Sequence, residues 1–86
     1  MTPKENLRQV RVLQEVADTL FGCKFRSDYS GRGMYGKLCC AITCDYAIAV
    51  IEICAQKGIK GAMVDDMGKG QIVYWPDISI TQFKED

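Results

Sequence analysis

The chain has 86 residues, 48% of them apolar, and a chain of this length provides for one hydrophobic core and therefore one domain. Its 11 basic and 11 acidic residues cancel, so nucleic acid is not indicated as a partner, because general nucleic-acid binders need a positive field. No apolar run approaches the roughly 18 residues of a membrane span, and none follows the N-terminus as in a signal peptide. We therefore expect a cytoplasmic protein without membrane contact, and we interpret its five cysteines as reduced thiols that serve as small apolar residues.

The first element is predicted to be an amphipathic helix. Thr2 can cap it by accepting a bond from the Glu5 amide, Pro3 suits its first position, and Glu5 can reach back to the cap. Apolar residues then recur at helical spacing: Val10, Leu13, Val16, Ala17, Leu20 and Phe21. Gly22 is expected to end the helix in a left-handed conformation.

From residue 23 the period changes to two, which predicts a hairpin. Two sets of residues alternate, as in a strand with one solvent-exposed face: Cys23, Phe25, Ser27 and Tyr29 on one side, and Lys24, Arg26 and Asp28 on the other. Residues 30–36 form the turn, and residues 38–43 return as a strand that is apolar on both faces and therefore central in the sheet.

A second helix is predicted from the N-cap Asp45 to Gly58. Its apolar residues cover about 220° of the helix surface, whereas packing on one sheet needs a stripe of only about 100°. The additional apolar surface packs either against the first helix or against a second copy of the chain, in which case residues 46–57 form a homodimer interface.

A third strand at residues 59–65, a turn at 66–70 and a fourth strand at 71–75 complete the pattern, since Pro76 ends the ladder. Residues 77–86 either add an edge strand or form a flexible tail. The sequence thus predicts a single α+β domain over residues 1–86. Its elements follow the order helix, hairpin, helix, hairpin (αββαββ), with a four-stranded antiparallel sheet and two helices on one face.

Residues 31–37 spell GxGxxGK, a string that brings backbone amides close to phosphate in nucleotide-binding proteins. Here a strand follows where a dinucleotide fold requires a helix, and the other parts of a protein kinase are missing. Two interpretations remain open. Arg32, Tyr35 and Lys37 form a basic tip that contacts an anion, a nucleotide or an acidic protein surface, or the glycines serve only the positive φ angles of the turn.

Catalysis is not expected, because the chain has no histidine to act as a general base. We also expect no cofactor and no metal: the cysteines lack zinc-site spacing, and Asp65 and Asp66 fit a plain turn better than a calcium loop. Tyr35, Tyr74 and Trp75 are residue types found in binding hot spots. Adjacent strand residues point in opposite directions, so at least one of Tyr74 and Trp75 belongs to the core.

Two segments, YSGRGMYGK at residues 29–37 and MGKGQIVYWP at residues 67–76, resemble a group of small uncharacterised bacteriophage and prophage proteins. The likeness spans residues 25–76 and implies a setting, a phage-encoded protein in a bacterial host, without a role for any residue. Small neutral phage proteins of this kind are often accessory factors that bind a host protein or a signalling nucleotide, including inhibitors of bacterial immunity.

The leading hypothesis is a non-catalytic interaction protein, in this setting an inhibitor of a host defence or regulatory complex. The alternatives are a protein that binds or sequesters a nucleotide and a structural subunit of a homo-oligomer. The candidate binding residues lie mainly in the first hairpin, and they are Arg26, Gly31, Arg32, Gly33, Tyr35, Lys37 and Trp75.

Overall fold

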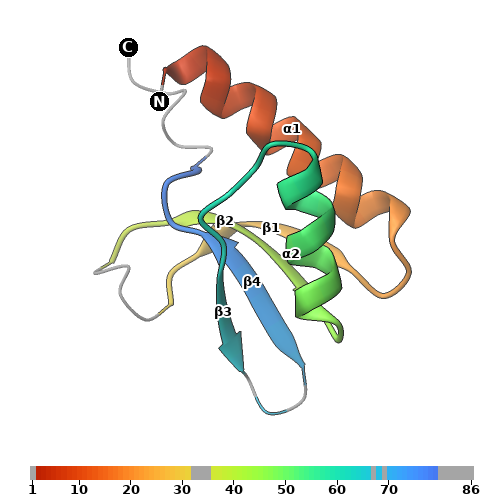
Figure 1. Ribbon diagram of the computed structural model, residues 1–86. Helices are drawn as coiled ribbons and strands as arrows, with labels where there is room; N and C mark the ends of the chain where they lie inside the picture. The colour runs from red at the N-terminus through yellow and green to blue at the C-terminus, as the bar shows by residue number, and fades with distance from the viewer. Residues whose placement is uncertain (1, 32–35, 67, 69, 80–86) are drawn as a thin grey trace.

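Two helices cover one face of a four-stranded antiparallel sheet in the computed structural model (Figure 1). The structure describes residues 2–31, 36–66, 68 and 70–79. The elements are α1 (Pro3–Thr19), β1 (Lys24–Tyr29), β2 (Cys39–Cys44), α2 (Ala47–Gln56), β3 (Met63–Asp66) and β4 (Gln71–Trp75). The strands lie in the order β1-β2-β4-β3, so β1 and β3 are the edges. The predicted α+β class and αββαββ order are confirmed.

The main core lies between the helices and the sheet. Phe25, Ile42 and Val73 stand opposite one another on successive strands and point toward the helices. The helices contribute buried side chains to the same cluster: Val10, Leu13, Val16 and Ala17 from α1, and Ala47, Val50 and Cys54 from α2. Burial of these apolar surfaces is the main source of stability for a chain of this size.

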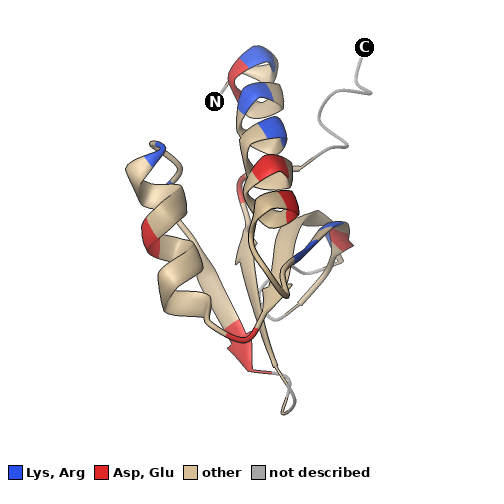
Figure 2. Cartoon of the chain, turned by 90° about the vertical axis from the view of Figure 1, so that its right-hand side faces the viewer, with Lys and Arg blue, Asp and Glu red and all other residues tan. Residues whose placement is uncertain are grey.

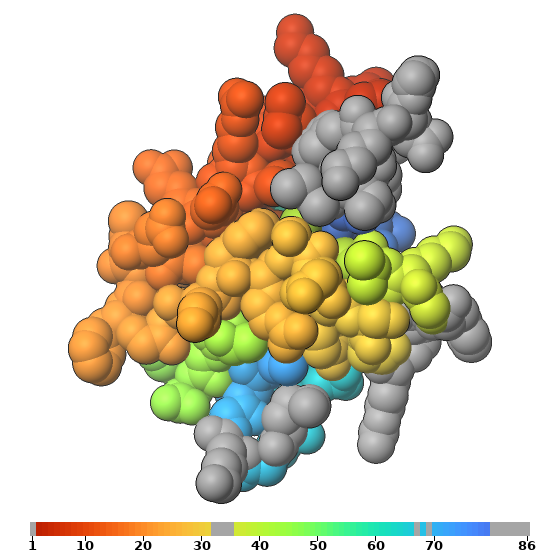
Figure 3. Space-filling model, turned by 180° about the vertical axis from the view of Figure 1, so that it is seen from behind, coloured from red at the N-terminus to blue at the C-terminus, as the bar shows by residue number. Residues whose placement is uncertain are grey.

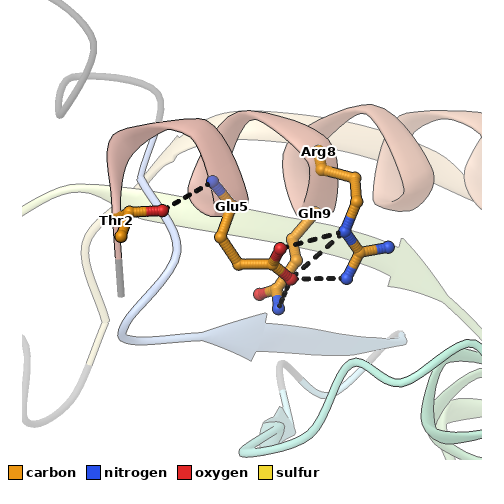
Figure 4. A network of polar contacts seen from close by, with 4 residues as sticks. All are labelled: Thr2, Glu5, Arg8 and Gln9. Carbon is orange, nitrogen blue, oxygen red and sulfur yellow. Dashed lines mark hydrogen bonds and ion pairs between the residues drawn. The ribbon is translucent and has the colours of Figure 1, made fainter.

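The start of α1 matches the predicted cap in part. Thr2 Oγ1 accepts a hydrogen bond from the Glu5 amide at 3.1 Å, and Pro3 occupies the first turn. The Glu5 carboxylate differs from the prediction, because it turns along the helix to bind Arg8 and Gln9 (Figure 4). The Arg8 guanidinium makes charge-assisted hydrogen bonds to the Glu5 carboxylate, which explains why this carboxylate does not bind the N-cap residue.

The N-terminus of α2 does not use the predicted cap residue. The helix begins at Ala47 with Tyr46 in the cap position, and Tyr46 makes no side-chain capping bond. The side chain of Gln71, from the neighbouring strand β4, instead accepts a hydrogen bond from the Ala47 amide at 3.2 Å. The prediction of Asp45 as the N-cap is therefore wrong, because a residue distant in sequence satisfies the first amide.

The second hairpin is shorter than predicted. β3 begins at Met63, and Ile59 is instead tied to the end of α2, since its amide donates to the Cys54 carbonyl at 2.9 Å. β4 has its predicted bounds.

The segment after β4 is attached to the domain without becoming a strand in the described residues 76–79. The Ile78 carbonyl accepts from the Cys40 amide at 2.8 Å. Asn6, which is completely buried, donates from Nδ2 to the Ser79 carbonyl at 2.8 Å and accepts from the Ser79 amide at 3.3 Å. The rest of the segment predicted as an edge strand or flexible tail, residues 80–86, lies outside the described residues.

Candidate functional site

The face of the sheet opposite the helices, called here the outer face, carries a second and smaller cluster. One row of this face crosses all four strands, and its paired residues are Arg26, Ala41, Tyr74 and Met63. The buried residues of the outer face are Tyr29, Cys39, Ala41, Ile72 and Tyr74. Because both helices lie on the other side, the side chains of the outer face must cover one another.

Tyr29 reaches the outer face through an irregularity of β1. Strict alternation from Phe25 places Tyr29 on the helix side, and this part of the sequence prediction is wrong: Phe25 packs with the helices and Tyr29 does not. The register of β1 against β2 shifts between Arg26 and Tyr29. Such a shift turns the following side chains to the opposite face of the sheet.

Once on the outer face, Tyr29 connects all four strands. Its ring lies 4.9 Å from the ring of Tyr74 on β4, with a tilt of 44°. Its hydroxyl donates a hydrogen bond to the Asp65 carboxylate on β3, the opposite edge. Burial, together with this hydrogen bond, raises the pKa of Tyr29 well above its usual value. The phenol therefore stays protonated and acts as a donor.

Arg26 adds charge to this surface. Its guanidinium lies 5.8 Å from the centre of the Tyr29 ring, within the range of a cation–π contact. Its Nε also lies 3.3 Å from the Asp28 carboxylate. Arg26 is therefore held over the aromatic ring at the edge of the sheet, where β1 crosses the surface as the gold segment of Figure 3.

The turn of the first hairpin begins against the ring of Tyr29. A Cβ atom added to Gly31 would overlap the Tyr29 hydroxyl and ring carbons, so this glycine is required by close approach. Gly36 has a φ of 84°, as expected for a turn glycine. Lys37 is exposed. The other predicted residues of the tip, Arg32, Gly33 and Tyr35, lie outside the described residues.

Trp75 does not belong to this surface. Its side chain is 1% exposed and packs in the main core under the helices. Tyr74 is equally buried but on the outer face, so both aromatic residues of β4 are packed inside. Of the predicted residues that the structure describes, Arg26 and Gly31 thus meet at Tyr29, Lys37 follows in the hairpin, and Trp75 is a core residue.

Tyr29 and Asp65 are the members of the site that the sequence analysis missed. The sequence pattern places Tyr29 on the wrong face, and it places Asp65 at the end of the third strand without assigning it a contact. No local pattern reveals the register shift, and residues 36 positions apart give no sequence signal of contact.

The exposed side of α1 carries a separate charge pattern. Apart from Glu5, the charged residues of its N-terminal half are basic (Lys4, Arg8 and Arg11), whereas those of its C-terminal half are acidic (Glu15 and Asp18). Figure 2 shows this change along the helix from mostly blue to red. Glu5 in the first turn agrees with the helix dipole, whereas the other charges are arranged against it, because the dipole favours acidic residues at the N-terminus and basic residues at the C-terminus. A shallow hollow of about 490 Å³ lies along these residues, and a second of about 360 Å³ lies beside Asp45 and Gly70. The described residues that line them include neither Gly31 nor Lys37.

No group of three or more His, Cys, Asp or Glu side chains among the described residues is arranged to hold a metal ion. None of the helices formed by those residues has the length and apolar character needed to cross a lipid bilayer.

Comparison of the chain with family models, with curated proteins and with solved structures finds no match. The resemblance to phage proteins therefore stays a prediction, and the site must be interpreted from its own geometry.

Proposed function

We propose that this chain is a non-catalytic binding protein that recognises another protein through the outer face and the adjoining first hairpin. The proposal rests on the direct contact between the hairpin and the outer face. Gly31, the first glycine of the hairpin, lies against the ring of Tyr29, which is the central side chain of the outer face. A partner that contacts the hairpin therefore also meets this face.

The residues at the surface suit a protein partner. Arginine is enriched in protein interfaces, and here the half-buried Arg26 is held over the ring of the buried Tyr29 before binding. A side chain that is ordered in advance loses less entropy on association. Lys24 and Lys37 are exposed nearby, which favours a partner surface that carries carboxylates.

The resemblance to phage proteins supplies the setting of this proposal. We propose a bacterial host protein of a defence or regulatory complex as the partner, which the chain inhibits by occupying its surface. This part rests on the resemblance of residues 29–37 and 67–76, and it is tested separately by the identity of the captured protein.

The test is capture of a partner from bacterial lysate by the immobilised chain. Replacing Arg32, Tyr35 and Lys37 together by alanine should abolish capture of one stoichiometric protein, identified by mass spectrometry. The matched control replaces Lys57 and Lys60 by alanine, which removes the same number of positive charges away from the hairpin. The control should capture the partner as the wild type does.

Two results would contradict the proposal. Equal loss in both variants would mean that only net charge matters, and undiminished capture by the triple variant would remove the hairpin from the site. A nucleotide released when the purified protein is heated, seen by its ultraviolet absorbance, would instead support the nucleotide-binding alternative.

A second candidate function, that of a structural subunit in a homo-oligomer, is favoured by one observation. Ile48 on α2 is 74% exposed, while Val50 and Cys54 of the same helix are buried. Ile53 packs against the main core, so the additional apolar surface of α2 is only partly used inside the chain. Met63 and Val64 on the edge strand β3 are also exposed.

Sedimentation of the wild type and two variants tests this second candidate. If α2 forms a dimer interface, Ile48→Glu should yield monomers, because it places a charge in an apolar contact. Ala49→Glu is the control, since Ala49 is also exposed but lies on another side of the helix. A wild-type monomer at high concentration would exclude this function.

A further inference from the structure

Cys23 and Cys44 stand at equivalent positions at the open end of the first hairpin. The ladder between β1 and β2 pairs Lys24 with Thr43 and Phe25 with Ile42. Continuing this register by one residue places Cys23 opposite Cys44. Both side chains lie on the helix-covered face, where Cys44 belongs to the main core and Cys23 packs against it.

This arrangement meets the geometric requirement of a disulfide. Residues directly opposite in an antiparallel ladder have Cα atoms about 4.5–5.5 Å apart, and disulfides join Cα atoms about 4.4–6.8 Å apart. Burial is the main cause that raises the pKa of Cys44, and the neighbouring Cys23 thiol adds to it.

The two thiols differ in their access to solvent. Cys23 is half-buried, whereas Cys44 is buried. The Cys23 thiol donates a hydrogen bond to the Tyr46 hydroxyl at 3.3 Å, and that hydroxyl donates to the Phe21 carbonyl. A small oxidant from solvent therefore reaches Cys23 first, and Cys44 is the neighbour that can complete the reaction.

We propose that Cys23 and Cys44 form a dithiol that hydrogen peroxide oxidises to a disulfide. The Cys23 thiolate attacks one oxygen of the peroxide, the O–O bond breaks, and the leaving hydroxide takes up a proton to give water and a sulfenic acid at Cys23. The Cys44 thiol then loses its proton, its sulfur attacks the sulfur of Cys23, and the S–O bond breaks to release a second water. Two thiols thus lose two electrons and two protons, and one peroxide is reduced to two waters.

The other cysteines are placed less well for this reaction. Cys39 and Cys40 are neighbours on β2 and point to opposite faces of the sheet, so they cannot face each other. Cys54 on α2 is completely buried, and burial is the main cause that raises its pKa, with a smaller contribution from Cys23. Cys54 is therefore the competing partner. The register of the hairpin favours Cys44 over Cys54.

Oxidation would change the contacts at this end of the hairpin. Cys23 would lose the hydrogen that it donates to Tyr46, while the new S–S bond would join the start of β1 to the end of β2. The inference does not depend on the proposed binding function, because the thiols lie at the end of the hairpin opposite the glycine-rich turn.

Peptide mapping of the full chain tests the proposal. The reduced protein is treated with hydrogen peroxide, its remaining thiols are alkylated, and it is digested with trypsin without reduction. Residues 12–24 form a tryptic peptide with Cys23 alone, and residues 38–57 form one with the other four cysteines. We expect these two peptides to be joined with the loss of two hydrogen atoms, the fragment spectrum to place the bond at Cys44, and a thiol reductant to reverse it.

Variants make the assignment independent of the fragment spectrum. Cys44→Ser and Cys44→Ala should abolish the link and leave a sulfenic acid at Cys23 that dimedone traps. Cys54→Ser and Cys39→Ser should form the link as the wild type does. A link that survives in the Cys44 variants, a link to Cys54, or a Cys23 that remains a thiol or becomes a sulfinic acid in the wild type would overturn the proposal.

Discussion

The Tyr29 hydroxyl donates a hydrogen bond to the Asp65 carboxylate, and this contact joins the two edge strands of the sheet across the outer face. The Tyr29 side chain passes over the two central strands on its way from β1 to β3. The contact with Tyr74 and the cation–π contact of Arg26 both depend on this path. Tyr29 therefore holds together the surface that we propose as the binding site.

We expect Tyr29→Phe to lower the free energy of unfolding by about 1–2 kcal/mol, because the hydrogen bond is made to a charged acceptor that is only partly buried. Urea unfolding of Tyr29→Phe, Asp65→Ala and the double variant measures the coupling between the two groups. If the two single losses add up in the double variant, the hydrogen bond contributes nothing to stability.

Gly31 and Gly36 should respond differently to alanine. A Cβ at Gly31 overlaps Tyr29, and we expect a loss of about 1–3 kcal/mol from overpacking. At Gly36 the cost is about 1 kcal/mol, because alanine is strained at a φ of 84° although nothing lies near its Cβ. Urea unfolding of both variants in wild-type and Tyr29→Ala backgrounds separates the two causes. Truncating Tyr29 should relieve only the Gly31 variant, and equal relief would contradict the close approach.

Asn6 should anchor the segment that follows β4. Asn6→Ala leaves the backbone of Ser79 without the two bonds from this side chain, and we expect a loss of about 2–3 kcal/mol. Amide exchange at Cys40 should accelerate as well, because the Ile78 carbonyl that it binds lies in the same segment. Asn6→Asp is the informative comparison, since its carboxylate can still accept from Ser79 but cannot donate. Unchanged exchange at Cys40 in both variants would show that the segment is held by other contacts.

The sequence predicted those parts of the fold that depend on local patterns. The Thr2 cap, the apolar stripe of α1 from Val10 to Ala17 and the bounds of β4 follow from residues close in sequence, and the structure confirms them. The same pattern places Phe21 in this stripe, and that prediction is wrong, because Phe21 lies beyond the end of the helix and is 94% exposed. The start of α2 could not be predicted in this way, because Gln71, 24 positions away, satisfies its first amide. Ile59 likewise has the composition of a strand residue, but contact with the end of α2 decides its position.

The candidate site was less predictable for a related physical reason. The period-two pattern correctly places Phe25 and Arg26 on opposite faces, but one register shift reverses the face of Tyr29. A shift of this kind adds a single residue to one strand and leaves no mark on composition or charge. The pattern therefore places the tyrosine that organises the outer face on the side of the helices.

Stability should be independent of pH near neutrality and should fall in alkaline solution. The chain has no histidine, so no group with an ordinary pKa of about 6.5 links folding to pH there. Burial raises the pKa of the Cys39 and Cys54 thiols to about 11. In the unfolded chain these thiols ionise at about 8.5.

Stability falls at high pH because the folded chain keeps the protons of the Cys39 and Cys54 thiols to a higher pH than the unfolded chain does. Below about pH 8.5 both states hold these protons and the contribution to stability is complete, whereas above this pH the unfolded chain loses protons that the folded chain retains. We therefore expect the urea midpoint to fall progressively as the pH rises from about 8.5 toward the raised pKa. Replacing Cys39 and Cys54 together by alanine should flatten this fall, whatever the variant's stability at neutral pH. An equally steep fall in that variant would show that other groups, such as Tyr29 with its raised pKa, control alkaline unfolding.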